Sequence, residues 1–483
     1  MTSGFVPRAS PPPPTAGAVA WRATTLAPRA SEQAVAYLGS LCLRAFLAAQ
    51  FLSLTRLFFA RHLGEGFATF ASLAGILSVA LLFPALLTYG LQAGSLFGTL
   101  TPAARFWSSC LVILSVFLFL YGWLGKGYVV SAALHDLCPY LVIAAAVILG
   151  SNPRAWEDTD RVLVALFLAG LVLSAAGMTE ITQVVSEEFA EDRAGVSIVA
   201  YRMQGSLAFW PLLFLTARRR RPLAALFVHA GVFFVLGQQI LFQKRSPSVR
   251  VLLYVLVFLV VLPRLAPHGE GGSKAKRHLA AFTVAGALAL LVALTAVPWL
   301  FQGQAEGLLR RLSGQAYSGG AAAMLSWENE RFFEAAMFFR TLQPEELVFG
   351  RGFGGCFVPD APGWGVWLDD VNVVGRRQLH VGGLMPFFKG GFALALLYYA
   401  GLAGALWRGR LSLREHLAAA AFFVVLIHAV FLLQEGWFTM SVSFDLVAVG
   451  LCMGHLLSLE RGIRPEKGTR GLVVGDWPRG VAA

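Results

Sequence analysis

Charged residues are scarce in this sequence. Of its 483 residues, 14% are charged and 57% are hydrophobic. A soluble protein carries about 25% charged residues. Charges are costly where a surface faces lipid, so their shortage predicts a chain that lies largely within a membrane.

Cysteine is scarce as well. The chain has five cysteines and no CxxC pair, and only Cys356 lies well away from the apolar segments. This usage indicates neither a disulfide framework nor a zinc site. We expect no metal and no cofactor.

Acidic residues are fewer than basic ones, and the net charge is +12. A basic chain can bind nucleic acid, but here the positive residues form short runs between apolar segments, as in the cytoplasmic loops of membrane proteins. The pattern therefore favours the lipid bilayer as a partner and excludes nucleic acid. The runs cover residues 218–221, 274–277, 408–414 and 461–470.

Long apolar segments are abundant. A helix needs about 20 apolar residues to cross a bilayer, and this length predicts about twelve transmembrane helices. Arg44 and Arg56 interrupt the first segment, and Asp136 and Pro139 interrupt the fourth. The predicted spans lie near residues 34–59, 67–90, 105–124, 127–149, 161–178, 198–216, 222–242, 250–266, 279–301, 384–407, 416–434 and 438–459.

The charges between the spans predict the orientation. With the N-terminus inside, the basic runs follow spans six, eight, ten and twelve, and an acidic stretch from Glu180 to Asp192 follows span five on the outside. The chain is then an all-α integral membrane protein of the bacterial inner membrane with both termini in the cytoplasm. Its parts are an N-terminal tail (1–33), spans one to nine (34–301), a large periplasmic loop (302–383), spans ten to twelve (384–459) and a basic C-terminal tail (460–483).

The large loop is nearly balanced in charge, with nine acids and seven arginines. Its residues 322–341 predict a Phe-rich helix that could lie on the membrane surface, and Gly350–Gly355 predicts a flexible turn. No internal repeat pairs the spans as the halves of a transporter would pair.

Two arginines stand near the outer face among the spans. Arg202 lies within span six, either as a functional charge or as a side chain that snorkels to the interface. Arg245 follows Lys244 at the outer end of span seven, where cations break the positive-inside rule. An anionic ligand would explain them, because guanidinium binds phosphate oxygens in a bidentate manner; incidental surface charge is the alternative.

The loop adds further candidates. Arg331 lies on the Phe-rich helix, as an anion ligand or as an ordinary ion-pair partner of Glu334. His380 precedes span ten, and its imidazole can accept a proton near neutral pH, although an interfacial histidine is often structural. Asp369 and Asp370 could bind a metal, or be solvated.

Together these pieces resemble the O-antigen ligase/polymerase superfamily, by motif over residues 195–400 and by topology over the whole chain. Two positions depart from its pattern: Val381 replaces the usual Asn, and Lys244 the usual Ser. The motifs, in order, are Arg202 with Gly205, Lys244-Arg245-Ser246, Arg331 ahead of the turn with Gly352 and Gly354, and His380 followed by Gly390-Gly391.

The resemblance implies a metal-independent glycosyltransferase. The donor would be a glycan on undecaprenyl diphosphate, and the acceptor a hydroxyl of a glycan or lipid at the periplasmic face. Arg202, Arg245 and Arg331 would bind the diphosphate and stabilise its leaving charge, with Gly205, Lys244, Gly352 and Gly354 in support. His380 would be the catalytic base.

Three alternatives stay open. The enzyme is either an O-antigen or exopolysaccharide polymerase or an O-antigen ligase of lipopolysaccharide biosynthesis, and the two share donor and fold. A polysaccharide-precursor flippase or transporter is a different class, which the single long loop and the lack of repeats disfavour. A metal-dependent membrane glycosyltransferase would use Asp369 and Asp370, but such enzymes carry acids in a long first outer loop, which is short here.

Overall fold

The regular secondary structure of the described residues is helical. The computed structural model describes residues 30–55, 63–92, 94–184, 334–357, 379, 381–413, 415–432 and 444–459, with short pieces at 230–231, 233–234, 253–261, 264, 284 and 286. No β-strand occurs among these residues. The predicted all-α class is therefore confirmed for the described part of the chain.

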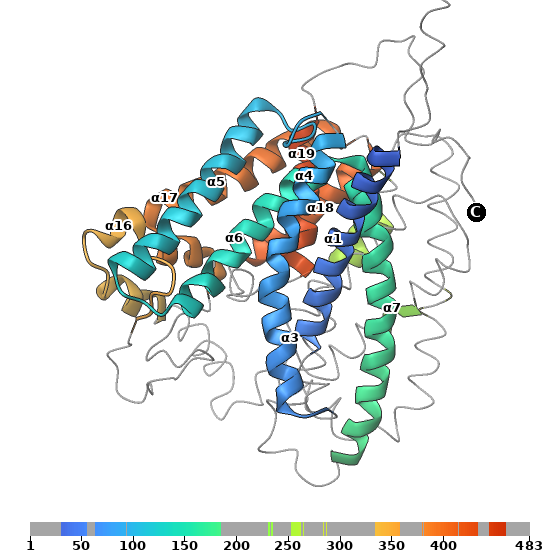
Figure 1. The fold of residues 1–483 in the computed structure, drawn as a ribbon, viewed down its shortest axis with the longest axis horizontal. Coiled ribbons are helices and arrows are strands. Elements are labelled where there is room, and N and C mark those ends of the chain that lie inside the picture. The colour runs from blue at the N-terminus through green and yellow to red at the C-terminus, as the bar shows by residue number, and fades with distance from the viewer. Residues whose placement is uncertain are drawn as a thin grey trace, which may run out of the picture.

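The helices form an elongated bundle (Figure 1). In chain order they are α1 (Ala30–Leu54), α3 (Glu65–Leu77), η2 (Ser78–Leu81), α4 (Leu82–Gln92), α5 (Pro102–Leu120), the π-helix η3 (Tyr121–Gly125), α6 (Val130–Gly150), α7 (Pro153–Val184), the π-helix η4 (Val257–Val261), a helical segment at residues 334–340, α16 (Glu346–Phe349), η5 (Gly382–Leu384), α17 (Met385–Gly409), η6 (Arg410–Ser412), α18 (His416–Phe431) and α19 (Phe444–Ser458).

Within the described ranges, four helical stretches are long and apolar enough to cross a membrane: Thr69–Gln92, Pro102–Gly125, Val130–Gly150 and Gly382–Ser412. They agree closely with the second, third, fourth and tenth predicted spans. The structure thus has the character of a helical membrane protein, whereas the total of twelve spans stays a prediction. The spans expected between residues 198 and 301 lie almost entirely outside the described residues.

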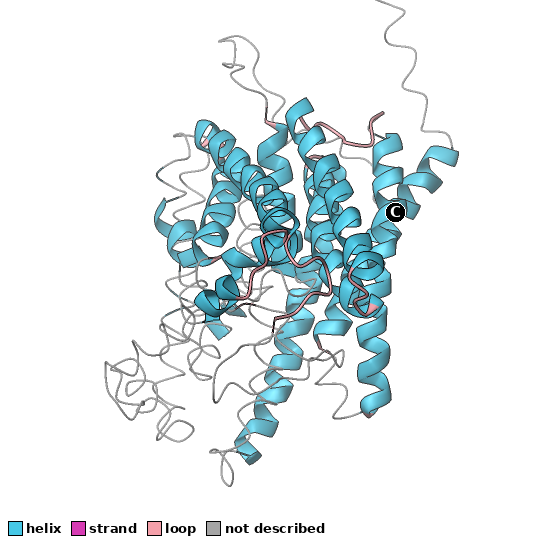
Figure 2. Cartoon of the chain, turned by 90° about the vertical axis from the view of Figure 1, so that its left-hand side faces the viewer, coloured by secondary structure: helices cyan, strands magenta, loops and turns pink. Residues whose placement is uncertain are grey.

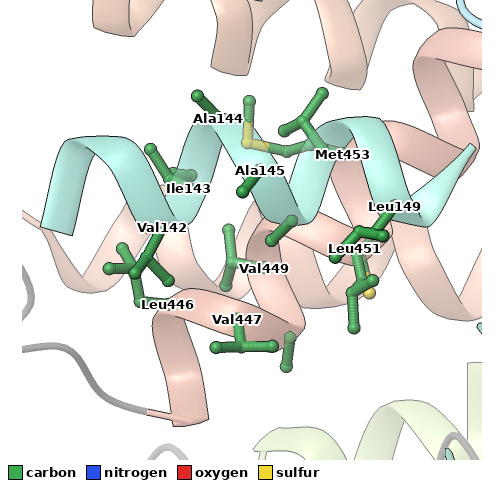
Figure 3. Close-up of a cluster of buried hydrophobic side chains, with 14 of the residues drawn as sticks. Val142, Ile143, Ala144, Ala145, Leu149, Leu446, Val447, Val449, Leu451 and Met453 are labelled. Carbon is green, nitrogen blue, oxygen red and sulfur yellow. The ribbon is translucent and has the colours of Figure 1, made fainter. Parts of the chain in front are cut away.

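Helix α6 lies at the centre of the bundle and packs closely on α19. Their contact is lined by small residues, and a Cβ on Gly150 or Gly454 would overlap the backbone of the other helix. Small residues let helix backbones approach closely in membranes. Around them lies a cluster of buried apolar side chains (Figure 3), which includes Val142, Ile143, Ala144, Ala145, Leu149, Leu446, Val447, Val449, Leu451 and Met453.

The charged residues that interrupt the apolar segments have partners. Arg44 of α1 lies 3.1 Å from Asp158 of α7, and the Tyr89 hydroxyl of α4 donates to the same carboxylate over 2.7 Å. Asp136 of the fourth span is also paired, with Lys389. Arg56 lies outside the described residues.

The described part of the large loop packs at one end of the bundle. Helix α16 lies beside α17 and α5 (Figure 1), and Figure 2 turns this end toward the viewer. Phe349 of α16 contacts Phe117 of α5, with 5.2 Å between the ring centroids. Of the helix predicted at 322–341, residues 334–341 are described; residues 334–340 are helical, and the helix ends there in a turn at residue 341.

Candidate functional site

The glycine-rich turn after α16 is inserted among the ends of the membrane helices. All of its residues from Gly350 to Gly355 are buried. Four successive backbone N–H groups of the turn donate hydrogen bonds to residues of α5, α6 and α17. These bonds run from Arg351 to the Phe388 carbonyl (3.0 Å), from Gly352 to the Lys389 carbonyl (3.1 Å), from Phe353 to the Leu118 carbonyl (3.3 Å) and from Gly354 to Asp136 Oδ2 (2.7 Å).

A break in α17 makes two of these acceptors available. Gly391 has φ 60° and ψ −157°, which is not helical, and glycine adopts such angles most readily. The carbonyls just before a break lose the N–H donors of the next helical turn and need other partners. The turn supplies those donors to Phe388 and Lys389.

The turn and the break approach each other at backbone distance. A Cβ on Gly350 would lie 2.6 Å from the backbone nitrogens of Gly390 and Gly391. On the other side, a Cβ on Gly122 of η3 would overlap the carbonyl oxygen of Phe353. Only glycine fits at these positions.

A buried ion pair lies beneath the turn. Lys389 Nζ lies 2.6 Å from Asp136 Oδ2, and the two side chains are 1% and 6% exposed. The ammonium also donates to the Gly355 carbonyl over 2.8 Å and lies 4.7 Å from the centroid of the Phe388 ring. Burying two charges is costly, and further hydrogen bonds offset that cost; here the turn provides them.

Arg351 joins several parts of the loop from within. Its Nη1 donates to the Cys356 carbonyl over 2.8 Å, and its Nη2 donates to the carbonyl and hydroxyl oxygens of Thr341, over 2.8 and 2.7 Å. Its Nε lies 3.4 Å from Glu346 Oε2. The planar guanidinium suits this role because its donors have a fixed geometry.

An aromatic cluster brings together segments that are distant in the sequence. Phe338 from 334–340 and Phe357 beyond the turn both pack edge-on against Phe388 of α17. Leu379, the residue before His380, is buried in the same cluster. The segments that follow Arg331 and flank His380 in the chain thus meet at the turn.

The predicted site residues fall into two groups. Gly352 and Gly354 are described, and both are buried with positive φ in the docked turn. The others, namely Arg202, Gly205, Lys244, Arg245, Arg331 and His380, lie outside the described residues, as do Asp369 and Asp370. Their roles stay predictions.

The sequence reasoning missed two residues of this region. Asp136 counted only as an interruption of the fourth span, and Lys389 drew no attention. A signal was present, because a charged residue inside an apolar span is functional by default and needs a partner. Nothing in the spacing paired Asp136 with Lys389.

Two titratable side chains between η3 and α6 have raised pKa values. Tyr128, in the connection between η3 and α6, lies under Gly354, and burial raises the pKa of its phenol. The phenol therefore stays protonated at neutral pH. Hydrogen bonding to Tyr121 raises the pKa of the neighbouring Lys126, which stays positively charged.

Comparisons with known proteins give no further assignment, since neither a scan against protein-family models nor searches of curated proteins and of solved structures found a match. The fold and this region define a helical membrane protein with a glycine-rich loop segment inserted at one end of its bundle.

Proposed function

We propose that this chain is a multi-pass enzyme of the bacterial inner membrane, with about twelve spans, that transfers a glycan from a polyprenyl diphosphate carrier to an acceptor hydroxyl at the periplasmic face. Its activity is that of an O-antigen or exopolysaccharide polymerase or of an O-antigen ligase. The proposal rests on the order of the motifs along the chain.

One structural observation carries the proposal further. The turn with Gly352 and Gly354 and the Gly390-Gly391 pair are separate motifs in the sequence, yet they touch at backbone distance. Leu379, next to His380, is buried in the adjoining cluster. Motifs that serve one reaction need to converge, and the described ones do.

The proposed reaction balances as a substitution at the anomeric carbon. The acceptor oxygen forms a bond to that carbon while the bond to the diphosphate oxygen breaks. His380 takes the proton of the acceptor hydroxyl, and Arg202, Arg245 and Arg331 stabilise the charge that develops on the leaving diphosphate. The chemistry needs no redox partner, and we expect transfer to survive a strong chelator.

The test is transfer by the purified full chain with an undecaprenyl-diphosphate-linked glycan. His380→Ala is expected to lower kcat at least about a hundredfold with donor binding largely kept. Arg245→Ala should abolish transfer, and Arg245→Lys should restore little because the fork geometry is lost. Normal turnover in both alanine variants would overturn the proposed roles.

A deletion strain separates the two activities. Short surface polysaccharide on a gel indicates a polymerase, whereas full-length chains left on the lipid carrier indicate a ligase. Glycan precursors that accumulate on the cytoplasmic side, with transfer intact in isolated membranes, would instead support a flippase and overturn the proposal.

A further inference from the structure

The glycine-rich turn enters the depth of the membrane helices. Asp136, which accepts from Gly354, lies six residues beyond Val130, the first residue of α6. At 1.5 Å per residue, this position is about 9 Å along the helix. Non-helical backbone at membrane depth must be hydrogen-bonded within the protein, and the N–H groups of residues 351–354 all are.

Two of the anchors on this turn are ionised side chains. Asp136 Oδ2 accepts from both Gly354 N–H and Lys389 Nζ, and Lys389 Nζ donates in addition to the Gly355 carbonyl. The pair therefore binds the N–H group of Gly354 and the carbonyl group of Gly355, which flank the peptide bond between these two residues, and it specifies where this part of the turn lies. Four of the turn's residues, Gly350, Gly352, Gly354 and Gly355, offer no side chain for apolar packing.

Stability alone does not account for such a pair. Well-packed apolar residues in place of a buried ion pair are often neutral or stabilising. The distinctive property of Asp136 and Lys389 is that their polar atoms point at the backbone of the turn, which apolar residues cannot replace. The pair is suited to fixing a position rather than to adding stability.

We propose that Asp136 and Lys389 are positioning residues of the transfer reaction. They hold the turn inside the bundle. The turn adjoins the apolar cluster that contains Phe338, Phe388 and Leu379, and the pair thereby also positions the segments that continue along the chain to Arg331 and His380. This inference rests on the proposed function. It assigns no contact of either side chain with the donor or the acceptor.

Two double variants isolate the contacts with the turn. Asp136→Leu with Lys389→Met removes both charges and both anchors. Asp136→Asn with Lys389→Met removes the same charges but keeps an oxygen that accepts from Gly354. The control is Arg44→Met with Asp158→Asn, which neutralises an ion pair away from the turn, 3.1 Å long and between α1 and α7.

The first readout is independent of activity. Cys356 adjoins the turn and is partly buried, so its thiol reports whether the turn is docked. In a full chain with Ala at the other four cysteines, a maleimide should label Cys356 at least about tenfold faster in the Leu/Met variant. The Asn/Met variant should fall between it and the parent, and the control should match the parent.

The second readout separates positioning from binding. Misplacement of catalytic groups by about 1 Å costs up to about a hundredfold in rate. We expect the Leu/Met variant to lose at least about tenfold in kcat, with the donor KM within about threefold.

The outcomes are distinct. Unchanged labelling and unchanged kcat in the Leu/Met variant overturn the inference. If that variant does not accumulate in the membrane, the Asn/Met variant decides, and parent-like labelling and kcat there overturn the inference equally. Faster labelling in a chain whose parent transfers no glycan would overturn the proposed function while supporting the anchoring of the turn.

Discussion

Arg351 connects three parts of the described loop, namely Thr341, Glu346 and Cys356. It bonds the carbonyls of Thr341 and Cys356 and faces Glu346, and both charged side chains are 10% exposed. Arg351→Met should lower stability by about 2–4 kcal/mol, because it removes the hydrogen bonds of the guanidinium and the cation that faces the nearly buried carboxylate of Glu346. Unfolding in detergent, monitored by circular dichroism, measures this loss.

The control for Arg351 lies in the same segment. Arg340 is exposed, and Arg340→Met should change stability by less than about 0.5 kcal/mol. Glu346→Gln added to Arg351→Met should recover part of the loss, because it removes the unpaired charge. Equal stability of the two methionine variants would contradict the role given to Arg351.

Gly122 and Gly125 make a second residue-scale comparison, within one π-helix. A Cβ on Gly122 would overlap the Phe353 carbonyl, whereas a Cβ on Gly125 would lie 3.4 Å from Tyr121, an ordinary contact. Gly122→Ala should therefore displace the turn and raise the labelling rate of Cys356 at least about tenfold, and Gly125→Ala should not. Equal rates in the two variants would show that the turn does not press on η3.

At the level of single residues, the sequence indicated which residues are unusual but did not predict which residues they contact. Gly352 and Gly354 stood out because they belong to a predicted glycine-rich turn. Asp136 and Arg44 stood out as charges within apolar segments. Their partners, Lys389 and Asp158, are brought near only by the tertiary packing of helices, and no spacing rule connects them.

Helix α17 shows the same limit at the scale of an element. Its apolar length predicted a span at 384–407, close to the observed Met385–Gly409. The break at Gly391 was not predicted, because a glycine within an apolar run occurs also in regular helices. The break becomes intelligible once the docked turn is seen to supply the donors that the broken helix lacks.

Two glycines of α17 test that account. At Gly391, Ala would be strained at φ 60° and its Cβ would overlap the Val348 carbonyl, whereas a Cβ on Gly404 would lie 3.7 Å from Leu457. Gly391→Ala should destabilise the protein by about 1–3 kcal/mol. Gly404→Ala should be neutral or stabilising by up to about 1 kcal/mol, because it lies within a regular helix.

Unfolding midpoints in detergent and the labelling rate of Cys356 check both variants. The Gly391 variant should show faster labelling as well as lower stability, since the turn and the break support each other. A Gly391→Ala protein as stable as the Gly404→Ala protein would contradict the coupling.

At the scale of the whole molecule, hydropathy predicted the long helices that the structure describes, but not which of these helices touch. Side chains that face lipid and side chains that face the core are equally apolar in a membrane protein, so the pattern does not separate them. The close contact of α6 with α19 depends on Gly150 and Gly454. For the same reason the packing of the glycine-rich turn was not predicted, because the sequence of 350–355 does not indicate which helix ends it contacts.

The orientation of the molecule is the prediction on which the proposed reaction depends, and α17 offers its test. The helical stretch Gly382–Ser412 has 31 residues, and the part that follows the break at Gly391 spans about 30 Å at 1.5 Å per residue, which matches a hydrocarbon core of about 30 Å. Glu345 is exposed next to α16 at one end, and Glu415 is exposed beyond the other end. If α17 crosses the membrane, the two lie on opposite sides.

In a full chain without other cysteines, Glu345→Cys should react with a membrane-impermeant maleimide in intact cells, and Glu415→Cys should react only after the inner membrane is permeabilised. The basic run at 408–414 is the physical reason, because arginines beside a span remain in the cytoplasm. Each substitution replaces an exposed glutamate, so the variants serve as controls for each other. The reverse result would put the loop in the cytoplasm and exclude transfer at the periplasmic face, and labelling of both positions in intact cells would show that α17 does not cross the membrane.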